Sequence, residues 1–132
     1  MPLGSVLIVE DDPVIAMATQ MVFEDAGAVP ITVTASTQDA MAALRSKLPD
    51  VLVLDIHLSD SDDGWAIAEL IQSLDARNTR IIFATGAPQD IPAPIAALGT
   101  VLEKPLAANA LLAAARRAPR RGVLAALRRS AR

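Results

Sequence analysis

Five short apolar runs, each of strand length, alternate along the chain with segments whose apolar residues recur at helical spacing. The runs occupy residues 5–10, 29–33, 51–54, 80–84 and 100–103. Neighbouring parallel strands need crossover connections, which helices normally supply. The alternation therefore predicts an α/β fold, in which a doubly wound, five-stranded parallel sheet lies between two layers of helices.

The segment after the first run has the clearest helix signals. Asp12 is a good N-cap and Pro13 suits the first helical turn, while Gly27 provides the end. Between them an apolar repeat at helical spacing predicts the helix: Val14, Met17, Ala18, Met21 and Val22.

Three further helices are predicted. One begins at Ser36 or Thr37 and continues to about Lys47, with Ala40, Leu44 and Leu48 on one face. Another repeats apolar residues from 67 to 74, and the last spans residues 107–117. Three prolines between residues 87 and 98 allow only a short or irregular turn of helix near 95–98.

Size and composition fit one domain with a single core. The chain has 132 residues, 52% of them hydrophobic, and no apolar run approaches the roughly 18 residues of a membrane span. It has no cysteine, and its N-terminus lacks the basic flank of a signal peptide. We expect a cytoplasmic protein without membrane contact, with a domain over residues 1–118 and a tail over 119–132.

Charge is distributed unevenly along the chain. The residues through Ala115 hold 5 basic and 15 acidic side chains, whereas the remainder holds seven arginines and no acid. Three interpretations of this basic tail remain open: a solvated end, an amphipathic turn in which Val123, Leu124 and Leu127 dock on the body or a partner, and nucleic-acid binding. We do not expect the last, because the tail has no aromatic residue for base stacking.

Four of the apolar runs end in polar residues. These are Glu10-Asp11-Asp12, Asp55, Thr85 and Lys104-Pro105. Parallel strands deliver their carboxyl ends to one edge of the sheet, where open α/β sheets bind ligands. Adjacent carboxylates repel one another unless a cation offsets them, and hard oxygen ligands without a His or Cys cluster suit Mg²⁺. An aspartate beside such an ion can attack phosphorus, while a lysine and a threonine can stabilise the phosphoryl oxygens.

The same residues resemble the receiver domain of two-component response regulators over residues 4–117. The matching motifs are residues 7–13, the strand that ends at Asp55, Ala84-Thr85-Gly86 and Lys104-Pro105. The resemblance implies a flavodoxin-like fold and a phosphoacceptor that is not an enzyme acting on a separate substrate. Its implied site comprises Asp55 as phosphoacceptor, Thr85 as switch hydroxyl, Lys104 as phosphate-contacting amine, a cis bond before Pro105, and Mg²⁺ (or Mn²⁺) held by Glu10, Asp11, Asp55 and the backbone carbonyl of His57.

The segment Phe83-Ala84-Thr85-Gly86 resembles the "FAT GUY" subgroup of receivers, which are mostly single-domain proteins of general-stress phosphorelays. The resemblance implies a sensor histidine kinase or histidine phosphotransferase as phosphodonor and a monomer or a phosphorylation-dependent dimer. Its output would be contact with a downstream protein partner or phosphate shuttling. Val101 stands where many receivers have an aromatic residue, so coupling through a rotating aromatic ring is not available here.

Two alternatives remain from other functional classes. A phosphohydrolase with an aspartyl-phosphate intermediate usually has a second aspartate two residues after the nucleophile, where this chain has His57. A degenerate receiver that serves only as a scaffold would not need the full set of acidic, hydroxyl and amine groups.

Overall fold

The fold is a single parallel sheet in a three-layer arrangement, described by a computed structural model for residues 3–56, 65–73 and 78–117. The five strands are β1 (Val6–Val9), β2 (Ile31–Thr34), β3 (Val51–Asp55), β4 (Arg80–Thr85) and β5 (Thr100–Glu103). All pairings are parallel and the strand order is β2-β1-β3-β4-β5. The predicted doubly wound α/β architecture is therefore confirmed.

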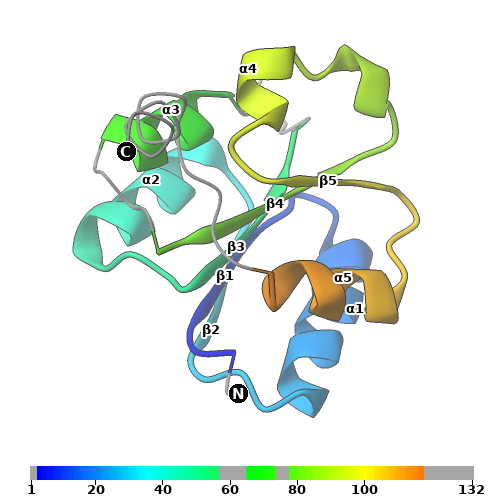
Figure 1. Cartoon of the computed structure of the whole chain (residues 1–132). Coiled ribbons are helices and arrows are strands. Elements are labelled where there is room, and N and C mark those ends of the chain that lie inside the picture. The colour runs from blue at the N-terminus through cyan, green and yellow to red at the C-terminus, as the bar shows by residue number, and fades with distance from the viewer. Residues whose placement is uncertain (1–2, 57–64, 74–77, 118–132) are drawn as a thin grey trace, which may run out of the picture.

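Helices cover both faces of the sheet (Figure 1). They are α1 (Pro13–Asp25), α2 (Thr37–Ser46), α3 (Trp65–Ser73), α4 (Ala93–Ala96) and α5 (Ala108–Ala115), with a 3₁₀ turn η1 over Pro88–Asp90. Helices α1 and α5 lie on one face, and α2, α3 and α4 lie on the other. Within the described residues, no helix is long and apolar enough to cross a bilayer.

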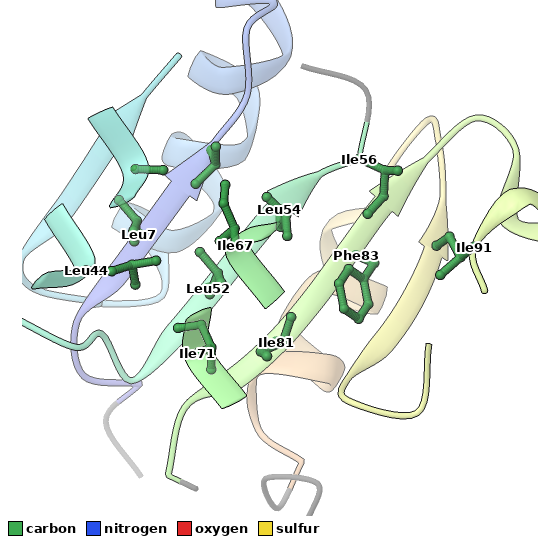
Figure 2. Packing of buried hydrophobic residues seen from close by; sticks show 12 residues of the cluster. Leu7, Leu44, Leu52, Leu54, Ile56, Ile67, Ile71, Ile81, Phe83 and Ile91 are labelled. Atoms are coloured by element: carbon green, nitrogen blue, oxygen red, sulfur yellow. The ribbon is translucent and has the colours of Figure 1, made fainter. Parts of the chain in front are cut away.

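The side chains of β3 point alternately to the two faces of the sheet, and both faces are covered by helices, which explains why its apolar run is continuous. Leu52 and Leu54 pack against α2 and α3, whereas Val51 and Val53 pack against α1 and α5. Figure 2 shows the first of these clusters, in which Ile67 and Ile71 of α3 lie against β3. A strand buried on both faces needs apolar residues at every position.

The structure confirms the first predicted helix and corrects two other sequence expectations. Helix α1 buries Ala16, Thr19 and Phe23, and it leaves Val14, Met17 and Met21 of the apolar repeat exposed. Leu48 does not continue the face of α2, since that helix ends at Ser46 and Leu48 is 37% exposed. The proline-rich segment holds a 3₁₀ turn as well as the short helix, and that helix begins two residues earlier than expected.

Candidate functional site at the carboxyl edge

Strand register brings the polar strand ends to one place. Val9 is level with Leu54, so the residues that follow, Glu10 after β1 and Asp55 at the end of β3, lie side by side. Asp55 in turn is level with Ala84, and Thr85 is level with Glu103. Thr85 therefore lies one residue beyond the position level with Asp55, and Lys104 lies one residue beyond the position level with Thr85. This stagger places Lys104 just beyond the end of β5.

Lys104 contacts two carboxylates across this edge. Its Nζ donates a hydrogen bond to Glu10 Oε1 at 2.8 Å and lies 3.4 Å from Asp55 Oδ1. The backbone N–H of Lys104 donates to the carbonyl of Thr85 at 2.8 Å, which fixes the lysine relative to β4. The peptide bond between Lys104 and Pro105 is cis, as the sequence resemblance implied. The amine is thus held between the two buried acids.

Three carboxylates form a cluster that could hold a metal ion. One oxygen from each of Glu10, Asp11 and Asp55 lies within 4.8 Å of the others. Glu10 is 5% exposed and Asp55 is 4% exposed, while Asp11 is half-buried. Oxygen ligands of this kind fit Mg²⁺, which usually keeps several of its waters and takes phosphate oxygens as further ligands. The donor set therefore fits the ion that the resemblance implied.

The electrostatics of Glu10 show that the cluster carries excess negative charge. Burial, together with the adjacent carboxyl of Asp55, raises the pKa of Glu10 from 4.5 to about 7. The hydrogen bonds from Lys104 and from the N–H of Asp12 oppose this rise without cancelling it. For Lys104 burial lowers the pKa, but the hydrogen bond to Glu10 and the charge of Asp55 outweigh it and raise the pKa above 10.5. One lysine does not neutralise the two buried acids.

Thr85 is buried at the end of β4, and its hydroxyl oxygen accepts a hydrogen bond from the N–H of Ala87 at 2.9 Å. This contact ties the threonine side chain to the start of the loop that leads into η1. A movement of the Thr85 side chain would therefore break or form its hydrogen bond with the Ala87 N–H at the start of that loop.

The structure brings together Glu10, Asp11, Asp55 and Lys104, and it places Thr85 at the same edge. His57, whose carbonyl was expected as a metal ligand, lies outside the described residues. Asp12 turns outward and caps α1, since its Oδ1 accepts from the N–H groups of Val14 at 2.9 Å and Ile15 at 3.3 Å. Sequence reasoning missed the direct Glu10–Lys104 contact and the Ala87 N–H as partner of Thr85. The contact between Glu10 and Lys104 has no local signal, because these residues are 94 positions apart and meet only where separate strand ends come together. The contact of Thr85 is local, since a threonine hydroxyl at a strand end can accept from the N–H two residues further on.

Comparison with known proteins agrees with this geometry. The family described as response regulator receiver domain matches residues 6–116. The virulence factors putative positive transcription regulator BvgA of Bordetella pertussis is 35% identical over 88 residues, which are 67% of this chain and 41% of BvgA. The chain thus spans less than half the length of that relative.

Solved structures give the same result. The structure of the PhyR stress response regulator superposes with a TM-score of 0.67 at 27% identity, covering 83% of this chain and 42% of PhyR. A putative response regulator from Chloroflexus aurantiacus superposes with a TM-score of 0.70 at 28% identity, covering 86% of this chain and 93% of that protein. With the fold, the strand-end residues and the family match in agreement, the chain belongs to the response regulator receiver domains of two-component systems.

Proposed function

We propose that this receiver domain accepts a phosphoryl group on Asp55 from a phosphohistidine of a sensor kinase or a histidine phosphotransfer protein. The observation that carries the proposal is the buried carboxylate of Asp55 at the sheet edge, 3.4 Å from the amine of Lys104 and within 4.8 Å of two further carboxylates. The family match supports a phosphohistidine protein as partner.

The reaction is a transfer between two protein side chains. A carboxylate oxygen of Asp55 forms a bond to phosphorus while the bond from phosphorus to the donor's imidazole nitrogen breaks, and the imidazole leaves with a proton from solvent. Lys104 lies where its ammonium can pair with a phosphoryl oxygen. To do so it gives up part of its contact with Glu10, so phosphorylation redistributes charge between these two residues.

Glu10, Asp11 and Asp55 would hold Mg²⁺, which supplies positive charge for the phosphoryl oxygens and for the acids themselves. Phosphoryl transfer depends mainly on such positioning and charge stabilisation. Glu10 retains a raised pKa despite its contact with Lys104. Lys104 therefore does not fully offset the negative charge of the cluster, which favours binding of an additional cation.

Phosphorylation would be read out through the loop after β4. Thr85 would turn its side chain so that the hydroxyl donates to a phosphoryl oxygen, and this turn would move the hydroxyl oxygen away from the Ala87 N–H that it now accepts from. The surface from η1 to β5 that a protein partner contacts would change as a result. Val101 lies half-buried against the core cluster beside α4, so an aliphatic side chain occupies the place of the aromatic relay. The likeness to PhyR supports a place in a stress-response phosphorelay.

Incubation with acetyl phosphate and Mg²⁺, followed by intact mass spectrometry, tests the proposal. We expect the wild-type chain to gain one phosphoryl group and the Asp55→Asn variant to gain none. Asp12→Asn is the matched control, because asparagine also caps helices and Asp12 lies outside the cluster, so this variant should be phosphorylated normally.

The other outcomes separate the alternatives. Absence of phosphorylation at every Mg²⁺ concentration would overturn the proposal and favour a scaffold. Continuous release of phosphate from small phosphomonoesters, lost in Asp55→Asn, would favour a phosphohydrolase. Phosphorylation that persists in Asp55→Asn would place the acceptor at another residue.

A further inference from the structure

Helix α1 exposes an apolar stripe that no described part of the chain covers. Val14 is 76% exposed, Met17 is 64% exposed and Met21 is 55% exposed, and their spacing places them on one side of the helix. The opposite side, with Ala16, Thr19 and Phe23, packs against the sheet. We call Val14, Met17 and Met21 the α1 stripe. Contiguous exposed apolar side chains of this kind mark interaction surfaces.

Carboxylates flank the α1 stripe at both ends. Asp12 precedes it, while Glu24 and Asp25 follow Met21 by three and four residues and lie exposed on the same helix. Helix α1 itself contains no lysine or arginine. An occupant of the stripe should therefore combine apolar side chains with positive charge on either side of them.

The end of this chain has that composition. Residues 118–132, which lie outside the described part, contain five arginines and no acid. Val123, Leu124 and Leu127 stand in the middle, between the pairs Arg120-Arg121 and Arg128-Arg129. The order of charge and apolar residues in this segment thus mirrors the order of acids and apolar residues along α1.

The exit point of the segment permits this contact. Helix α5 packs beside α1 on the same face of the sheet (Figure 1), since Leu111, Ala114 and Phe23 share one core cluster. The chain leaves α5 at Arg117, whose carbonyl accepts a hydrogen bond from Arg80 at the start of β4. Helix α1 runs antiparallel to β1, so its Glu24–Asp25 end lies at this same amino edge of the sheet.

The reach of the segment after α5 agrees with the length of α1 as well. From Val14 to Asp25 the helix rises about 16 Å at 1.5 Å per residue. The five residues 118–122 can extend over roughly 17 Å. The apolar residues at 123–127 therefore reach the stripe from the end of α5 without any change in the described fold.

We propose that the arginine-rich segment 118–132 binds the α1 stripe of its own chain, with Val123, Leu124 and Leu127 on Val14, Met17 and Met21, and with its arginines on the flanking carboxylates. The contact is independent of phosphorylation chemistry. If the proposed function holds, the bound segment also lies beside the sheet edge that a phosphodonor protein must approach.

Methyl NMR on the full chain tests this contact. The chain has no cysteine and four methionines, so a nitroxide can be attached to a Ser130→Cys variant and read out on ¹³C-methyl methionine. We expect the nitroxide to remove most of the signal of Met17 and Met21. Met41, which packs against the core cluster on the opposite face of the sheet, should keep its signal and serves as internal control.

Two further measurements define the contact. Adding Leu124→Asp and Leu127→Asp to the labelled variant should restore the signals of Met17 and Met21. Raising the salt concentration to 1 M, where the Debye length is about 3 Å, should restore them in part. Unchanged positions of the Met41 signal would verify that the fold is intact in each variant.

Three results would overturn the proposal. Full signals for Met17 and Met21 beside the nitroxide would exclude the contact. Equal loss at Met41 would show that the segment has no preference for α1. Signal loss in isotope-labelled chains caused by nitroxide on separate, unlabelled chains would assign the stripe to a second copy or to another molecule instead.

Discussion

The raised pKa of Glu10 predicts how stability depends on pH when no divalent cation is present. Between pH 4.5 and about 7 the unfolded chain releases the Glu10 proton while the folded chain still holds it. Because the folded state then binds more protons, the free energy of unfolding falls as pH rises through this window. The difference between 4.5 and about 7 corresponds to about 3 kcal/mol, most of which is lost by pH 8.

Mg²⁺ should flatten this decline, since it binds the ionised acids of the folded state. A ligand present at 100 times its dissociation constant adds about 3 kcal/mol to stability, which is comparable to the cost of ionising Glu10. Urea unfolding followed by circular dichroism, at pH 5, 6, 7 and 8 with EDTA or with Mg²⁺, measures both effects.

The Glu10→Gln variant is the control for this experiment, because glutamine does not titrate. Its metal-free stability should change little in the pH 5–7 window. A metal-free wild-type protein that becomes more stable from pH 5 to pH 7 would refute the reasoning, as would an equal decline in Glu10→Gln.

Three more predictions concern single residues and use the same urea assay. Lys104→Met removes the cation that contacts Glu10 and Asp55, so we expect a loss of about 3 kcal/mol without metal that Mg²⁺ partly restores; full metal-free stability would contradict the charge pairing. Asp12→Ala should cost about 1 kcal/mol by removing the cap of α1, whereas an equal loss in Asp12→Asn would argue against capping. Phe83→Ala should cost about 3–5 kcal/mol, since Phe83 is fully buried within the cluster of Figure 2, and a smaller loss would indicate that the core closes over the space.

The sheet and its edge could be predicted because they depend on simple patterns. A strand buried on both faces leaves a continuous apolar run, as in Val51–Leu54, and a parallel arrangement sends every following polar residue to one edge. Contacts within the edge could not be predicted, since they depend on the stagger between strands and on side-chain reach. The pairing of Lys104 with Glu10, which are 94 residues apart, is of this second kind.

Helix α1 shows that a hydrophobic pattern can locate a helix without identifying its buried face. Valine and methionine at helical spacing predicted the helix, but it packs through the smaller Ala16 and Thr19 together with Phe23. Small residues allow a helix to approach a sheet closely, and Thr19 meets its polar requirement by donating its hydroxyl to the carbonyl of Ile15 at 2.9 Å. The more hydrophobic residues remain outside, where they are available for binding.

Two consecutive residues connect the candidate site with the exposed face of α1. Asp11 contributes its carboxylate to the cluster with Glu10 and Asp55, whereas Asp12 turns outward and caps the helix that carries Val14 and Met17. A cation bound in the cluster and arginines bound along α1 would therefore act on neighbouring carboxylates without needing the same one. The domain has more acidic than basic residues, and the raised pKa of Glu10 is one sign of this excess. A metal ion can offset the negative charge of the buried cluster, while the arginines of segment 118–132 can offset that of the exposed carboxylates along α1.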